Sequence, residues 1–522
     1  MKPQLLLSMK GYKRKDLLGD LMAGLMVAII ALPLSIALGI QSVPAEVSTR
    51  GIQFGIITAI VAGFFISAMG GSKHQIGGPT AAFVTILFGY LANPDIGILG
   101  LAVAGIMAGV ILIVMGLLKA GNVMKFFPFP ITVGFTTGIG VTLLIGQIKD
   151  FCGFNASGTE ALEKIVSYVE NISTFDLATF GVGALGLLCV ILLPKLSKKI
   201  PAAFVALIVC TGATFLLNNV LGASVATIGS KYGEVQAGFF PMDFSRIGEV
   251  KFGALILPSI VIAFLCAIES LLSATVAANM TGTNFDANQE LIGQGVANIG
   301  SSLLGGLPAT GAIARTAASI ENGAKTPLAG IFHALFLLVM YFALMSVLQY
   351  IPLAVFSAIL MSVAINMSRF PLFAKLARFG IRDAIVLWVT FILTVVFDLT
   401  YGVLGGVAVT FFVNIKNIKI GMSVSLDERD ENKNGTPDCA TLNVKGTLFF
   451  LNANKLVDKA IETLQGVDKL ILDFSGVARI DETALQKVKS IESAAAKADK
   501  SVELLGLNAD MMARFEKFYK VV

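Results

Sequence analysis

Apolar residues dominate the chain up to about residue 416, in runs long enough to cross a lipid bilayer. Short polar or charged stretches separate these runs. The pattern predicts about fourteen membrane elements, of which two, at 78–91 and 309–322, are short and rich in small residues. The twelve ordinary spans are expected at 17–40, 52–69, 96–118, 131–148, 176–194, 201–221, 254–279, 288–304, 327–349, 353–367, 382–399 and 402–416.

The two short windows resemble each other and occupy matching positions in the two halves of the membrane part. The first reads IGGPTAAFVTI from Ile76, and the second reads LGGLPATGAIART from Leu304. Each is the third of seven elements on its side of the polar stretch 222–252. Short segments interrupted by Gly and Pro at matching positions indicate the binding site of a transporter. The alternative is a pair of kinked helices that pack through small residues.

Composition and charge agree with a polytopic membrane protein, because 55% of the residues are hydrophobic and only 14% are charged. Lys and Arg precede the first span and recur in alternate loops, which predicts an even number of crossings and two cytoplasmic termini in the inner (plasma) membrane. Membrane lipid is therefore an expected partner. The net charge of +5 gives no reason to expect nucleic acid. The five cysteines form no CxxC or Cys/His cluster, so neither metal nor cofactor is expected. His74 and His333 lie near predicted span ends and are expected at the interface.

The composition changes after Met422, where a polar tail begins. Residues 421–440 are expected to form a linker or the start of a soluble domain, and 441–522 a small domain of alternating strands and helices. Within it, TLNVKGTLFFL predicts a hairpin with Gly446 near its turn. A lead-in at 1–16 and a transport domain at 17–420 complete the organisation. The chain contains no phosphate-binding loop and no nucleophile with a base, so it is not expected to be an enzyme.

Nearly the whole chain resembles the sulfate permease (SulP) family, and its tail resembles a STAS domain. The resemblance lies in ALPLSIALGI, in GGPTAA, in the long segment from Asn288 to Gly330 and in DFSGVARIDETAL. It implies a seven-plus-seven inverted repeat, a core bundle that moves against a gate bundle, and a homodimer. In the tail, Asp481 fits the STAS pattern, but Glu482 and Thr483 replace the hydroxyl pair that is phosphorylated in anti-sigma antagonists. A packing and dimerisation role is therefore expected ahead of regulation.

An anion site follows from the geometry of the two short windows. Half-helices that begin at mid-membrane aim unpaired N–H groups and positive dipole ends at a common point. Arg315 adds a permanent charge, which is costly at bilayer depth unless it faces a cavity; the alternative is an arginine that reaches back to the cytoplasmic interface. The predicted substrate-binding residues are Pro79, Thr80, Ala81, Ala82, Thr310, Gly311, Ala312, Ala314 and Arg315.

Glu269 is the second charge predicted to lie within the membrane. A carboxyl group in an apolar helix can exchange a proton, and intramembrane acids of this kind mark proton relays. The family resemblance places Glu269 on the eighth helix, beside the anion site, where coupled members carry an acid. Glu269 and Ser273 are therefore predicted to bind the coupling ion, H⁺ or alternatively Na⁺. A neutral or Arg-paired structural acid is the other interpretation.

The sequence thus predicts a secondary active transporter of small inorganic or carboxylate anions, of the sulfate, dicarboxylate or bicarbonate class. Proton-coupled symport by alternating access is the expected mechanism. The alternatives are sodium-coupled bicarbonate uptake and a nucleobase permease of the same fold, in which Arg315 would be superfluous. A membrane enzyme or scaffold has no motif to support it. A site built from backbone dipoles reads charge and size more than identity, so the sequence does not select one anion.

Overall fold

A computed structural model describes residues 1–121, 128–156, 158, 160–196, 201–368, 370–378, 380–397, 399–418, 422–428, 439–449 and 452–519. The chain divides into two compact units. The first combines Met1–Lys125 with Ile139–Met367, and the second combines Phe126–Gly138 with Ser368–Val522. The fourteen predicted membrane elements are all present as helices, and nine helices of the described chain are long and apolar enough to cross a membrane.

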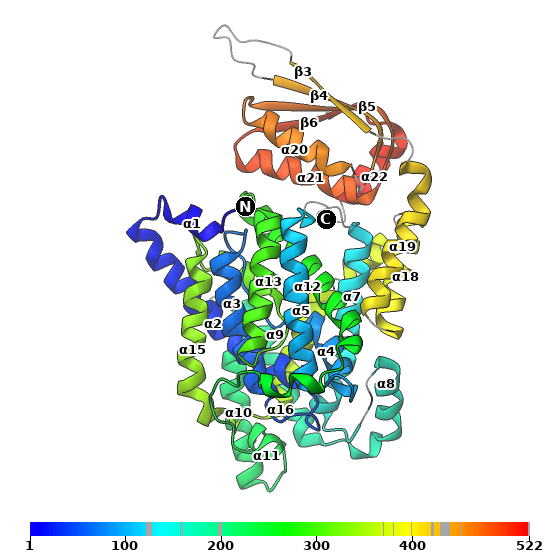
Figure 1. Cartoon of the computed structure of the whole chain (residues 1–522). Coiled ribbons are helices and arrows are strands. Elements are labelled where there is room, and N and C mark those ends of the chain that lie inside the picture. The colour runs from blue at the N-terminus through cyan, green and yellow to red at the C-terminus, as the bar shows by residue number, and fades with distance from the viewer. Residues whose placement is uncertain are drawn as a thin grey trace. The chain divides into compact units, whose positions relative to one another are not determined.

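A core bundle of eight helices fills most of the first unit (Figure 1). Helix α13 packs along α5 and α3, while α2 packs along α15 and α3. Small residues permit this close packing: a Cβ added to Gly39 of α2 would lie 2.2 Å from the carbonyl oxygen of Gly51 in α3. The core helices are α2 (Arg14–Ser42), α3 (Gly51–Met69), α4 (Ala81–Ala92), α5 (Gly97–Leu117), α12 (Phe252–Thr281), α13 (Ala287–Leu303), α14 (Ile313–Glu321) and α15 (Leu328–Leu348).

The membrane helices outside the core bundle make up the gate set, which is divided between the two units: α9 pairs with α10 in the first unit, and α18 pairs with α19 in the second. Its members are α7 (Phe129–Cys152), α9 (Leu177–Leu196), α10 (Ala202–Val220), α16 (Leu353–Ser368), α18 (Ile381–Val396) and α19 (Leu399–Ile418). The short connecting helices are α1 (Gln4–Met9), α8 (Ala161–Glu170), η1 (Ile172–Thr174), α11 (Ile228–Tyr232), η2 (Phe244–Glu249) and α17 (Phe370–Leu376). This arrangement confirms the inverted repeat of two times seven elements.

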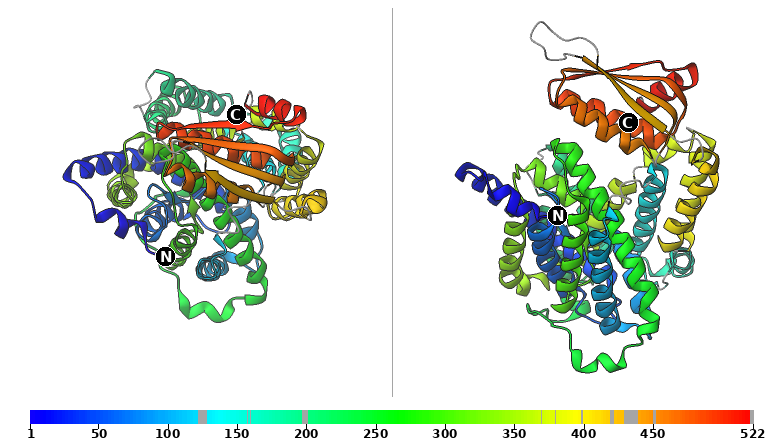
Figure 2. Two further views of the ribbon diagram at one scale, coloured as in Figure 1. Left: turned by 90° about the horizontal axis from the view of Figure 1, so that it is seen from above. Right: turned by 45° about the horizontal axis from the view of Figure 1, so that its top comes forward.

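The soluble tail contains a four-stranded sheet in the order β3-β4-β5-β6, with helices on one face (Figures 1 and 2). Strands β4, β5 and β6 are parallel and β3 is antiparallel to β4. The strands are β3 (Met422–Glu428), β4 (Cys439–Leu448), β5 (Lys469–Ile480) and β6 (Ser501–Leu505), and the helices are α20 (Ala453–Leu464), α21 (Glu482–Lys497) and α22 (Ala509–Tyr519). Within the predicted linker 421–440, β3 is a strand and residues 429–438 lie outside the described part.

The predicted hairpin around Gly446 is wrong, because β4 runs straight through this residue. Gly446 has φ of +99°, and the register between β4 and β5 shifts between Gly446 and Thr447. A glycine with positive φ beside a register shift is typical of a bulge. The glycine that suggested a turn in the sequence is therefore the site of a bulge within β4.

The hydrophobic core of the tail continues into the ends of three membrane-domain helices of the same unit. Phe129 of α7, Leu376 of α17 and Leu387 of α18 belong to the buried cluster that contains the strands β4 and β5. The backbone N–H of Phe129 also donates a hydrogen bond to the hydroxyl of Thr483, at 3.0 Å. Thr483 thus has a structural role at the start of α21.

Candidate functional site

The two short windows meet as a pair of two-residue strands in the first unit. Strand β1 (Gly77–Gly78) pairs antiparallel with β2 (Thr310–Gly311), and Gly78 lies opposite Thr310. Helix α4 begins at Ala81 and α14 at Ile313, directly after these strands. Neither helix has a side-chain cap, although the N–H of Phe83 in α4 donates to the carbonyl oxygen of Thr80 at 3.2 Å. Within the described part of the chain, the first two amide groups of each helix make no hydrogen bond and are available to a ligand. The predicted meeting of two half-helices is therefore present.

Arg315 is 2% exposed and holds the backbone of the opposite window. Its Nη2 donates to the carbonyl oxygen of Pro79 at 2.6 Å, and its Nη1 donates to that of Gly77 at 3.4 Å. Arg315 is thus tied to the residues that precede α4. It does not reach back toward a membrane interface, so the structure opposes that alternative.

Gly78 makes this contact sterically feasible. Its φ is +146°, and an added Cβ would lie 2.3 Å from Nη1 of Arg315. A side chain would therefore be strained by the backbone conformation and would also displace the guanidinium group. The close approach of the Arg315 guanidinium group to the backbone therefore explains why the first window has a glycine at position 78.

Glu269 contacts the same segment from α12. The hydroxyl of Thr80 donates to Oε2 of Glu269 at 2.9 Å. The side chain of Glu269 is partly exposed, whereas Thr80 is 6% exposed. The two charged side chains thus bond to adjacent residues: Glu269 accepts from Thr80, and Arg315 donates to Pro79. Among the described residues they form no ion pair with each other within 4 Å.

The small residues predicted around the site divide by exposure. Pro79, Ala81, Ala82 and Ala312 are buried beside the helix starts, whereas Ala314, in the first turn of α14, is exposed. An exposed residue between Ile313 and the buried Arg315 shows which side of this turn is open. The side of the first turn of α14 that carries Ala314 is therefore accessible.

Three predicted residues, Thr310, Gly311 and Ser273, make hydrogen bonds within the protein that support the site. The hydroxyl of Thr310 lies 2.7 Å from that of Ser270 and donates to the carbonyl oxygen of Cys266 at 3.2 Å. Gly311 donates its N–H to the same Ser270 hydroxyl, at 3.0 Å. Ser273 donates to Thr316 of α14 at 3.3 Å and is fully buried. These contacts fix α14 against α12, and Thr310 and Ser273 have no free donor directed at a ligand.

Supporting residues in α13 were only weakly indicated by the sequence. Asn298 bonds to both backbone groups of Ala309: its Oδ1 accepts from the Ala309 N–H, and its Nδ2 donates to the Ala309 carbonyl oxygen, both at 2.9 Å. Glu290 is fully buried and accepts the N–H groups of Gly71 and Ser72, each at 2.9 Å. Both residues hold the loops that lead into β1 and β2. The only sequence signal for them is a polar residue in a predicted membrane element.

The two histidines, which were predicted to lie at the interface, are both buried inside the protein. His74 is 6% exposed and His333 is 0% exposed. The ring of His333 fits beside Gly63 of α3, where an added Cβ would lie 3.4 Å from Nδ1.

The geometry defines a class of protein: a polytopic membrane transporter with an inverted repeat and its candidate site where two half-helices begin. The family models agree, since the sulfate permease family matches residues 17–390 and the STAS domain matches residues 432–519. The chain belongs to the sulfate permease family. Its members are transporters and not enzymes.

Individual relatives are similar over nearly their whole length. "Putative sulfate transporter YvdB" of Bacillus subtilis (strain 168) is 36% identical over 98% of this chain and 96% of its own. Bicarbonate transporter BicA of Picosynechococcus sp. is 28% identical over 96% and 91%. The solved transmembrane domain of a cyanobacterial BicA covers 75% of this chain and 98% of its own at a TM-score of 0.67 and 28% identity. The structure of SLC26A9 covers 99% of this chain and 89% of its own at a TM-score of 0.69 and 18% identity, which shows the shared fold.

Proposed function

We propose that the protein is a secondary active transporter of small anions, of the sulfate, bicarbonate or dicarboxylate class, that works as a proton-coupled symporter. The observation that carries this proposal is the joint attachment of Arg315 and Glu269 to the start of α4, through Pro79 and Thr80. The free amides of α4 and α14 supply the donors for an anion, and Arg315 supplies the positive charge. Both termini lie in the cytoplasm in this proposal, because basic residues precede the first span.

The bond between Thr80 and Glu269 supports a specific form of coupling. The Thr80 hydroxyl donates its single proton to the Glu269 carboxylate at 2.9 Å. Once Glu269 is protonated it becomes a donor itself, so Thr80 can accept from it and turn its own proton toward an anion. Protonation would also remove a negative charge that repels the substrate. Proton and anion therefore bind together in this proposal.

The decisive experiment is uptake into proteoliposomes with labelled sulfate, bicarbonate and fumarate, under imposed pH or sodium gradients. We expect an inward proton gradient to drive accumulation, and Glu269→Gln to abolish accumulation while anion exchange persists. Thr80→Val should weaken coupling in the same assay, and Thr80→Ser should restore it. Accumulation by Glu269→Gln that still follows the proton gradient would falsify the role of Glu269.

Sodium-coupled bicarbonate uptake is the second candidate, favoured by the likeness to bicarbonate transporter BicA over 96% of this chain. Uptake would then follow a sodium gradient at constant pH. Ser273 donates its hydroxyl proton to Thr316, which leaves the lone pairs of its oxygen to coordinate a cation. A nucleobase permease would instead show competition by uracil, and membership of the sulfate permease family argues against it.

A further inference from the structure

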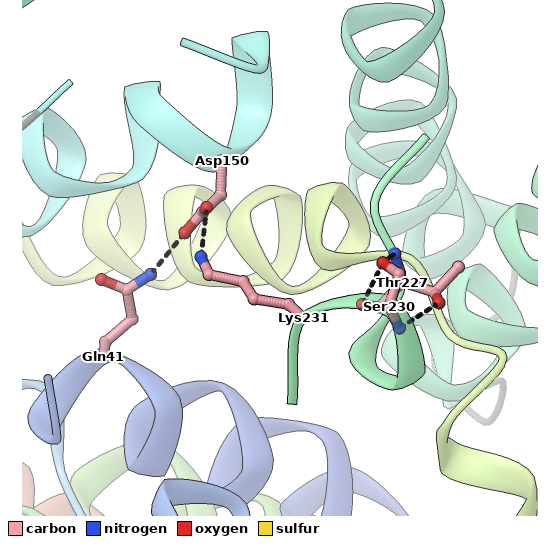
Figure 3. A network of polar contacts seen from close by, with 5 residues as sticks. All are labelled: Gln41, Asp150, Thr227, Ser230 and Lys231. Atoms are coloured by element: carbon pink, nitrogen blue, oxygen red, sulfur yellow. Dashed lines mark hydrogen bonds and ion pairs between the residues drawn. The ribbon is translucent and has the colours of Figure 1, made fainter. Parts of the chain in front are cut away.

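One carboxylate, Asp150 of gate helix α7, contacts the core bundle at the end of the membrane domain where α2 and α7 terminate. Gln41, near the end of α2, donates its side-chain N–H to Oδ2 of Asp150 in α7 at 3.3 Å (Figure 3). The other oxygen of Asp150 pairs with Nζ of Lys231 in α11, also at 3.3 Å. The Asp150 side chain is 17% exposed, so water screens this cluster only in part.

Lys231 lies on the short helix α11, which is held in place by local hydrogen bonds. Thr227 and Ser230 close a capping box at the start of α11, with Thr227 accepting from the N–H of Ser230 at 3.2 Å (Figure 3). The N–H of Ile228 donates to the carbonyl of Ile351, directly before gate helix α16. Lys231 therefore belongs to the gate side of the cluster, and Gln41 is its core-side member.

A second contact joins core and gate at the same end. Nζ of Lys164 lies 5.4 Å from the centroid of the Phe88 ring. Phe88 is in α4, whose opposite end forms the candidate anion site. Lys164 is in α8, which is tied to gate helix α7 because the Tyr168 hydroxyl donates to the carbonyl of Ile145 at 2.8 Å. Two independent cation-containing contacts thus close the core against the gate here.

We propose that Gln41, Asp150 and Lys231 form a latch that stabilises the conformation closed on the extracellular side and must open before an anion can bind from there. The proposal rests on the proposed transport function and on its orientation, which places this end outside the cell. Alternating access requires contacts that close one end and release it in each cycle. Partly exposed polar contacts are suited to this, because they are weak enough to break reversibly.

Another ion pair of the described chain provides a matched control. Lys251 and Asp95 approach to 2.6 Å at the same end, but they join the start of α12 to the turn before α5. Both helices belong to the core bundle and pack against each other. This pair should therefore remain closed throughout the transport cycle.

The test fixes each pair covalently in the reconstituted full-length protein. Four native cysteines are replaced and the fully buried Cys266 is kept, and then Gln41→Cys is combined with Asp150→Cys. A short bifunctional thiol reagent or an oxidant links the pair. We expect crosslinking to lower anion uptake at least tenfold, with recovery after reduction, while crosslinked Asp95→Cys/Lys251→Cys retains its uptake. If the crosslinked Gln41→Cys/Asp150→Cys protein takes up the anion as fast as the same protein after reduction of the crosslink, the latch is refuted.

A second measurement distinguishes failure of the latch from failure of the proposed function, because it needs no substrate. Asp150→Asn should increase hydrogen exchange at the ends of α2 and α7, and Asp95→Asn should leave both ends unchanged. In uptake, Asp150→Asn should lower the external KM about two- to fivefold, since a larger share of molecules is open to the outside. Unchanged exchange and unchanged external KM together refute the latch, whereas absence of uptake in the parent refutes only the transport proposal.

Discussion

Replacing Arg315 tests whether its charge is responsible for anion binding. The side chain lies in a buried position and donates to two carbonyl oxygens of the opposite window, those of Pro79 and Gly77. Arg315→Gln removes the positive charge and leaves a shorter side chain that cannot bridge both carbonyls. Arg315→Lys keeps the charge but lacks the planar guanidinium group with its paired N–H donors. The pair of variants therefore separates charge from geometry.

The structure sets the size of the expected effect. A hydrogen bond to a charged group contributes about 1.5–3 kcal/mol, and the 2.6 Å bond from Arg315 to Pro79 is the stronger of its two. If Arg315→Gln loses a contribution of this size from the anion complex, the dissociation constant rises about 10- to 100-fold. Arg315→Lys should recover about half of the free energy, because one donor and the charge remain.

The assay is equilibrium binding of labelled sulfate and bicarbonate to purified protein, with thermal unfolding as the control for folding. The expected order of affinity is parent, Arg315→Lys, Arg315→Gln. A folded Arg315→Gln protein that binds within twofold of the parent would refute the reasoning, and the arginine would then have only a structural role. Equal loss in both variants would mean that the two-carbonyl geometry matters more than the charge.

Three further changes test the surroundings of the site and the tail. Gly78→Ala should raise KM for the anion about tenfold or more by displacing the guanidinium, whereas Gly89→Ala, with open space at its Cβ, should not. Glu290→Ala leaves two buried N–H groups unpaired and should lower the free energy of unfolding by about 2–5 kcal/mol, measured by denaturation. Burial and the neighbouring Asp383 carboxyl raise the pKa of Glu482 well above its usual range. The folded chain then binds more protons than the unfolded one above about pH 4, so stability falls as pH rises, and Glu482→Gln should stabilise the protein more at pH 8 than at pH 5.

The sequence predicted the architecture because membrane helices leave a strong signal. Each apolar run corresponds to a helix, and the two short windows became α4 and α14 behind the strand pair β1–β2. Gly and Pro mark these windows because backbone that is not helical at this depth needs close partners and special conformations, as at Gly78. Arg315 and Glu269 could also be found, since each is a charge in an apolar surrounding.

The direction of individual side chains was beyond the sequence. Thr80 and Thr310 occupy similar places in the two windows, yet Thr80 contacts Glu269 and Thr310 contacts Ser270 and Cys266. Ser273 shares a helix with Glu269 but bonds to Thr316. These choices depend on how α12 is rotated against each half-helix. Helix rotation is set by tertiary packing, and the few polar residues of α12 stand in a sequence too apolar to predict which face meets each half-helix.

The arrangement of the two charges determines how many protons should accompany each anion in the proposed mechanism. Arg315 and Glu269 act on adjacent residues, so an ionised Glu269 offsets the charge of Arg315 and also occupies the Thr80 hydroxyl. Only one of these groups, Glu269, can take up a proton at physiological pH, because an arginine stays protonated. One proton per anion then makes bicarbonate symport electroneutral and leaves sulfate symport with a net charge of about −1 per cycle. Sulfate uptake should therefore slow when the liposome interior is made negative with valinomycin and potassium, while bicarbonate uptake should not respond. An equal response of both anions would show that a second proton or another ion takes part.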